Sequence, residues 1–107
     1  MIRSKRPRPP RYRFIASAEL TDTDSSEQLK EVISDLNLFG CYVRTQQPWP
    51  AGTHVRIRIS HKAAIFEALG RIAYAHRATG MGITFTFVGP NDELLLESWV
   101  AALRRED

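Results

Sequence analysis

Two short stretches of the sequence carry side chains whose types and spacing suit the binding of an anion. The first, SKRPRPPRYRF at residues 4–14, contains five basic residues and three prolines. Residues 1–13 hold six positive charges and no negative one, contributed by Arg3, Lys5, Arg6, Arg8, Arg11 and Arg13. Such a segment favours phosphate, nucleic acid, a lipid headgroup or an acidic partner.

The second stretch, SDLNLFG at residues 34–40, combines an acid, an amide and a glycine. Asp35 and Asn37 before Gly40 predict a tight turn whose polar side chains bond either local backbone or a ligand. From the residues alone both interpretations stay open. One is an Asx-type turn between two strands, and the other is part of a binding site.

Side chains typical of catalysis or metal binding are few and scattered. His54, His61 and His76 show no ligand spacing, and no glycine-rich phosphate loop is present. The single cysteine, Cys41, lies in a predicted strand, where a small buried residue is favoured over a reactive thiol. The sequence therefore predicts a binding protein without catalytic residues, metal or cofactor.

The composition is that of one globular domain. The chain has 107 residues, of which 43% are hydrophobic and 25% charged. Outside residues 1–13, nine Lys or Arg stand against twelve Asp or Glu, which makes the rest of the chain mildly acidic. Neither a membrane span nor a secretory signal is evident, so we expect a cytoplasmic protein.

The elements that must position these residues are mostly short strands. Alternating or continuous apolar runs predict strands at residues 12–20, 41–45, 54–60, 64–76 and 81–88. Gly70 indicates a bulge or close packing within the fourth of these runs. Trp49, between two prolines, is expected to plug a loop, with a stacking surface as the alternative. Sequential short strands favour an antiparallel barrel or sandwich.

Three further segments complete the prediction. Residues 25–37 are ambiguous, because a capping-box pattern and helical spacing slightly favour a short helix over a strand at about 31–36. Gly89 and Pro90 predict the start of a helix over about 90–104, with an apolar stripe that lies on the barrel. The prolines of residues 1–10 predict a flexible arm, followed by the domain at 11–107.

In order and spacing, these stretches resemble a PilZ domain, the bacterial receptor for the second messenger cyclic di-GMP. The family pattern has R-x-x-x-R just before the first strand and [D/N]-x-S-x-x-G between the second and third strands. Here RYRFIASAEL resembles the segment that begins at the second arginine, which corresponds to Arg11. DLNLFG occupies the place of the second motif, with Asp35 and Gly40 matching. Later segments are similar up to about residue 103.

The resemblance implies an all-β fold, a six-stranded antiparallel β-barrel with a C-terminal α-helix packed beside it. It implies a strand at about residues 28–35, against the helix that periodicity favours. It also implies a cyclic di-GMP effector with a downstream protein partner. The implied ligand-binding residues are Arg6, Arg8, Arg11, Asp35, Asn37 and Gly40.

The chemistry of these residue types suits that ligand. An arginine fork can donate two bonds to the O6 and N7 edge of guanine or to phosphate oxygens. A carboxylate such as Asp35 can accept from guanine N1–H and N2–H₂, and Asn37 can replace a serine hydroxyl as donor. Proline stiffening of the arm lowers the entropy lost when it wraps an anion.

Two positions depart from the family pattern. Pro7 stands four residues before Arg11, although Arg6 and Arg8 flank it, and Asn37 stands at the motif serine. The alternative function is therefore a degenerate PilZ domain that binds no nucleotide and docks on a partner protein. Non-specific nucleic-acid binding through the arm is a third hypothesis, which the acidic body disfavours.

Overall fold

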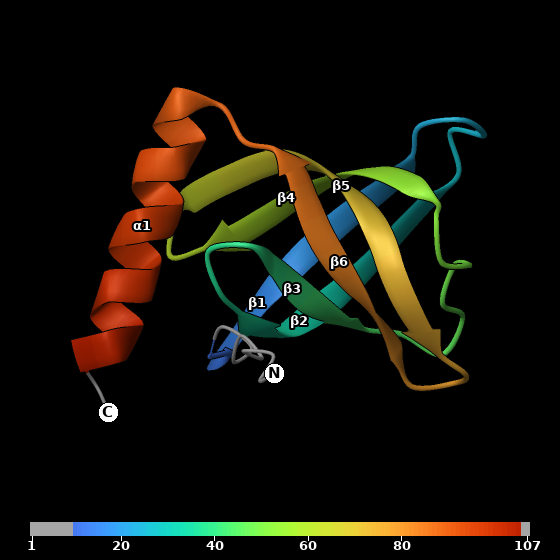
Figure 1. The fold of residues 1–107 in the computed structure, drawn as a ribbon, viewed down its shortest axis with the longest axis horizontal. Helices are drawn as coiled ribbons and strands as arrows, with labels where there is room; N and C mark the ends of the chain where they lie inside the picture. Colours follow the sequence, from blue (N-terminus) through green and yellow to red (C-terminus); the bar gives the residue numbers. More distant parts are fainter. Residues whose placement is uncertain (1–9, 106–107) are drawn as a thin grey trace, which may run out of the picture.

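Six strands and one helix follow one another in the computed structural model, which describes residues 10–105. The elements are β1 (Tyr12–Asp22), β2 (Gln28–Leu36), β3 (Gly40–Arg44), β4 (His54–His61), β5 (Ala64–His76), β6 (Gly80–Phe87) and α1 (Pro90–Arg105). Every pairing is antiparallel, and the strands close into a barrel in the order β1-β2-β3-β6-β5-β4 (Figure 1). The predicted barrel is confirmed, whereas the arm predicted at residues 1–10 lies, except for Pro10, outside the described residues.

Alternating side chains explain why these strands form a barrel. In β4, Val55, Ile57 and Ile59 are at most 1% exposed, while Arg56 and Arg58 between them face solvent. The same alternation places every second residue of β1, from Phe14 to Leu20, inside the barrel. A strand that buries one face keeps a fixed register, since a slip of one residue would expose its apolar set.

The segment expected to be helical is a strand, so the helix preference for residues 25–37 was wrong. β2 pairs with β1 and β3, as the family resemblance implied. A bulge at Ser34 breaks its alternation, because Ile33 pairs with Val43 while Asp35 pairs with Tyr42. Ile33 and Leu36 are consequently both buried although they lie three residues apart.

Helix α1 packs beside the barrel with the predicted stripe inward. Its first bond runs from the Glu93 N–H to the Gly89 carbonyl at 2.8 Å, which confirms Gly89 and Pro90 as its start. Leu96 and Val100 are 2% and 1% exposed. Trp99 lies against Phe14, with ring centroids 5.1 Å apart. Among residues 10–105, no helix has the length and apolar character needed to cross a membrane.

The remaining sequence predictions for the core are also met. Trp49 is 8% exposed in the loop after β3, and its N–H points at the Met81 sulfur at 3.3 Å. Gly70 lies at a register shift between β5 and β6, where an added Cβ would come within 2.9 Å of the Thr84 carbonyl oxygen. Both residues therefore have structural roles.

Candidate ligand-binding site

One row of paired residues crosses five neighbouring strands on the outside of the barrel. The row runs Arg13 (β1), Asp35 (β2), Tyr42 (β3), Gly82 (β6) and Tyr74 (β5). It brings a base, an acid and two aromatic rings together although they lie far apart in the sequence. The β2 bulge contributes directly, because it turns Asp35 outward beside Tyr42 while Leu36 stays in the core.

Arg11, just before β1, reaches across this row. A guanidinium nitrogen lies 3.9 Å from a carboxylate oxygen of Asp35, and the guanidinium also donates a hydrogen bond to the Tyr74 hydroxyl. Its central carbon lies 5.7 Å from the centre of the Tyr74 ring. The guanidinium is thus held between a carboxylate and an aromatic ring, and the Arg11 side chain as a whole is 35% exposed.

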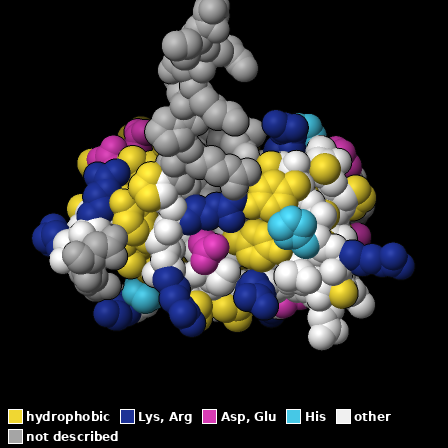
Figure 2. Space-filling model, turned by 60° about the horizontal axis from the view of Figure 1, so that its bottom comes forward, with side chains coloured by type: hydrophobic (Ala, Val, Ile, Leu, Met, Phe, Trp, Pro, Cys, Tyr) yellow, Lys and Arg dark blue, Asp and Glu magenta, His cyan; other side chains and the backbone are white. Residues whose placement is uncertain are grey.

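A second row continues the same surface along β3, β6 and β5. Arg44 pairs with Gly80, and Gly80 pairs with His76. The Tyr42 hydroxyl lies 3.0 Å from Nδ1 of His76. Together the two rows line an open hollow of about 640 Å³. Figure 2 shows a face on which basic, acidic, histidine and hydrophobic side chains meet in one patch.

The charges in this hollow favour an anion. Three guanidinium groups line it, from Arg11, Arg13 and Arg44, against the single carboxylate of Asp35. Electrostatic attraction to such a concave surface raises the local concentration of an anionic ligand. Its volume lies in the range typical of small-molecule sites.

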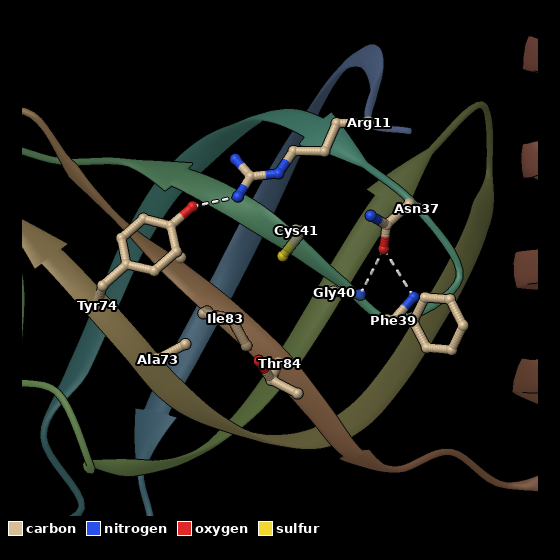
Figure 3. A pocket seen from close by; sticks show the side chains of 10 residues that line it. Arg11, Asn37, Phe39, Gly40, Cys41, Ala73, Tyr74, Ile83 and Thr84 are labelled. Atoms are coloured by element: carbon tan, nitrogen blue, oxygen red, sulfur yellow. Dashed lines mark hydrogen bonds between the residues drawn. The ribbon is translucent and has the colours of Figure 1, made fainter. Parts of the chain in front are cut away.

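The turn between β2 and β3 closes one end of the site. The side-chain carbonyl of Asn37 accepts hydrogen bonds from the N–H groups of Phe39 at 2.7 Å and Gly40 at 3.0 Å (Figure 3). This is the Asx-type turn that the sequence left open, and these two hydrogen bonds do not involve the Asn37 amide nitrogen. Arg11, Asn37, Gly40 and Tyr74 share a smaller hollow of about 140 Å³.

Gly40 has a packing reason of its own. A Cβ at this position would lie 2.0 Å from the carbonyl oxygen of Ile83, because β3 and β6 approach closely there. Only glycine fits without moving the backbone. The glycine of the motif therefore maintains the strand pairing that holds the Asn37 turn against β6.

Cys41 lies beneath the site without contributing chemistry to it. The side chain is 7% exposed, and burial raises the pKa of its thiol to about 12. A thiol that stays protonated at neutral pH is a poor nucleophile, so the expected buried filler is confirmed. Within residues 10–105, no group of three or more His, Cys, Asp and Glu side chains is placed to hold a metal ion.

The structure thus brings together four of the six residues singled out from the sequence. Arg11 lies close to Asp35, and it shares the smaller hollow with Asn37 and Gly40. Arg6 and Arg8 lie outside the described residues. Sequence reasoning missed Arg13, Tyr42, Arg44, Tyr74 and His76 as part of this surface. Strand alternation alone would have placed the Tyr42 side chain outward. That Tyr74 of β5 lies beside it follows from the register in which β6 pairs with β3 and with β5.

These features define a class of protein: a small antiparallel barrel whose outer face carries a hollow lined by cationic and aromatic side chains beside a polar turn. A family model for the PilZ domain matches residues 3–102. The chain therefore belongs to the PilZ domain family, whose members are binding modules. No curated protein matches it in sequence.

Solved structures have the same fold. The PilZ domain of CeSA from a cellulose-synthesizing bacterium is 23% identical, with a TM-score of 0.71 over 90% of this chain and 99% of that one. The PilZ domain of YcgR from Escherichia coli, solved with c-di-GMP, is 17% identical, with a TM-score of 0.75 over 95% and 94%. The Bacillus subtilis inhibitor of motility, MotI, is 14% identical, with a TM-score of 0.75 over 99% and 54%.

Proposed function

We propose that this chain is a cyclic di-GMP receptor module and that the outer face of β1, β2 and β3 is its binding surface. The observation that carries the proposal is the meeting of Arg11, Asp35 and the Asn37 turn on one hollowed face. Family membership and the c-di-GMP in the structurally similar YcgR domain support it.

Each side chain has a role that its chemistry allows. Arg11 donates to a phosphate or to a guanine O6 and N7 edge, and Asp35 accepts from guanine N1–H and N2–H₂. The Asn37 amide supplies a donor in place of the motif serine. We assign Gly40 to the ligand-binding turn, where it holds the backbone close to β6.

The arm completes the proposed site. We assign residues 1–10 to a basic arm and residues 11–107 to the domain, with Arg6 or Arg8 as the second cationic contact beside Arg11. The protein acts in the cytoplasm as a non-catalytic effector. Ligand binding then presents a changed surface to a downstream protein partner.

Calorimetric titration of the purified protein with cyclic di-GMP tests this function. We expect saturable binding by the wild type and a loss of at least about tenfold in affinity for Arg11→Ala, because a charge-assisted contact is removed. Arg56→Ala is the matched control, since Arg56 is exposed on β4 and lines a different hollow. Equal affinities of Arg11→Ala and the wild type would remove Arg11 from the site.

The same titration decides between this function and the alternative. A degenerate domain that docks on a protein would give no heat with cyclic di-GMP at high micromolar concentration. One observation favours the degenerate domain: the Asn37 side-chain carbonyl already accepts two hydrogen bonds within the turn, so that oxygen is unavailable to a ligand. The free Asn37 amide and the cationic hollow favour the nucleotide.

A further inference from the structure

Three rings form a cluster on the outside of the barrel, separate from the buried core cluster. The ring centroids of Tyr74 and His76 lie 5.1 Å apart, those of Tyr42 and His76 5.9 Å, and those of Tyr42 and Tyr74 6.2 Å. In the part of the chain that the structure describes, the buried core cluster contains none of the three. These residues are here called the aromatic ledge.

Two glycines of β6 make room for the aromatic ledge. A Cβ at Gly82 would lie 2.4 Å from the Tyr74 ring. One at Gly80 would lie 2.4 Å from the Val43 carbonyl oxygen and 2.6 Å from the Tyr42 ring. The rings of β3 and β5 therefore lie across the bare backbone of β6 between them. Any other residue at Gly82 would push the Tyr74 ring outward, whereas one at Gly80 would also strain the pairing of β6 with β3.

Hydrogen bonds fix the orientation of the ledge. The Tyr42 hydroxyl pairs with Nδ1 of His76 at 3.0 Å, and the Tyr74 hydroxyl accepts from Arg11. Burial raises the pKa of Tyr42, so its hydroxyl stays protonated at neutral pH. Within the ledge, Tyr42 is only 8% exposed, whereas His76 is exposed to solvent.

We propose that the aromatic ledge is a nucleobase-stacking surface, with Tyr74 and His76 as the rings that contact a purine base and Tyr42 as a positioning residue. The inference rests on the proposed function and extends its site beyond the motif residues. Bases stack on aromatic side chains, and the guanidinium of Arg11 lies beside the ledge, where it can meet the attached phosphate.

The site thereby gains a means of choosing its ligand. The cationic groups bind any phosphate, whereas a stacking surface adds affinity only for a ligand that carries a large flat base. Cyclic di-GMP and cyclic di-AMP should both use the ledge, because stacking tolerates different purines. Asp35 then distinguishes guanine from adenine by accepting from its N1–H and N2–H₂.

The test is calorimetric titration of ring variants with cyclic di-GMP. We expect His76→Ala and Tyr74→Leu each to weaken binding by roughly fivefold to a hundredfold, the range for losing one base–aromatic stack. Tyr74→Phe keeps the ring and loses only the hydroxyl, so its affinity should lie closer to that of the wild type. His54→Ala is the matched control, because His54 is exposed on β4 outside this surface.

Two further measurements separate stacking from a general structural role. Ring-proton signals of His76 should shift on addition of cyclic di-GMP, since a stacked base alters the local magnetic field. Gly82→Ala should displace the Tyr74 ring, because the atoms that the new Cβ would meet belong to a side chain that can move. Binding of cyclic di-GMP should then weaken, while the far-UV circular dichroism spectrum stays that of a folded barrel.

The outcomes distinguish the ledge from the function on which it rests. Wild-type binding with unchanged affinity in both His76→Ala and Tyr74→Leu would overturn the ledge and leave the proposed function standing. Absence of wild-type binding would overturn both. Weaker binding by the ring variants together with the His76 shift would support the ledge, and equal weakening by His54→Ala would count against it.

Discussion

A guanidinium nitrogen of Arg11 lies 3.9 Å from a carboxylate oxygen of Asp35, so the two charges are close but form no tight hydrogen bond. Each side chain keeps about a third of its exposure. A solvent-screened pair of this kind contributes about 0–1 kcal/mol to stability. A ligand can therefore take over both partners at little cost to the fold.

This geometry predicts that Asp35→Asn separates binding from stability. The substitution should change the free energy of unfolding by less than about 1 kcal/mol. Binding of cyclic di-GMP should weaken by about tenfold or more, because guanine N1–H and N2–H₂ lose a charged acceptor. Calorimetric titration and denaturant unfolding measure the two effects. Asp24→Asn, in the β1–β2 turn, is the control, and unaltered affinity in Asp35→Asn would exclude Asp35 from guanine recognition.

The Asn37 side chain should stabilise the turn as well as serve the site. Asn37→Ala leaves the N–H groups of Phe39 and Gly40 without their acceptor, so we expect a loss of about 1–2 kcal/mol in unfolding free energy. Asn37→Asp keeps an acceptor in place and should retain most of that stability. Urea denaturation of the three proteins compares them. Equal stability of Asn37→Ala and the wild type would contradict the role of the turn.

Much of the fold could be predicted from the sequence because alternation in β1 and β4 is regular. The exception was β2, where the bulge at Ser34 brings Ile33 and Leu36 to the same side. Apolar residues three and four apart are the signal of a helix, so a bulged strand imitates one. Pairing with β1 and β3, which periodicity cannot show, decides the structure.

The candidate site was predictable only in part, for a similar reason. Arg11, Asp35, Asn37 and Gly40 lie in motifs that can be read along the chain. Tyr74 and His76 reach the site by pairing with β6, more than thirty residues from Asp35 in sequence. At the site, the register of that pairing depends on the bulge between Ile72 and Tyr74 of β5, which, unlike the one at Gly70, no glycine marks in the sequence.

Gly40 should be irreplaceable for folding. Gly40→Ala would place a Cβ 2.0 Å from the Ile83 carbonyl oxygen, which belongs to the backbone and cannot rotate away. We expect a loss of about 3 kcal/mol or more in unfolding free energy. Gly89→Ala is the matched control, because the nearest atom to its added Cβ is 3.8 Å away. A Gly40→Ala protein as stable as Gly89→Ala would disprove the close approach of β3 and β6.

Cys41 should make the barrel sensitive to alkali. Burial raises the thiol pKa from 9.0 to about 12, so the folded state keeps its proton where the unfolded state loses it. This contribution to stability is complete below about pH 9 and is lost as the pH rises towards 12. Cys41→Ala should show a smaller loss of stability across that window in denaturant titrations. Rapid reaction of the native thiol with a disulfide reagent at neutral pH would show that Cys41 is not buried.

The last prediction concerns the basic arm. It asks whether cyclic di-GMP binding depends on the positions of the arm's arginines or only on their charge. Pro7 stands where the family has its first arginine, so Arg6 or Arg8 must provide the second guanidinium in our proposal. Arg6→Gln or Arg8→Gln should weaken cyclic di-GMP binding more than Lys5→Gln, which removes the same charge from the same arm. Pro7→Arg restores the family spacing and should tighten binding.

Titrations at low and moderate salt separate a contribution from charge alone from that of a specific contact. The purely electrostatic contribution is weakened by salt screening, whereas a bidentate contact persists. Equal effects of all three glutamine variants at both salt concentrations would mean that the arm contributes only its charge.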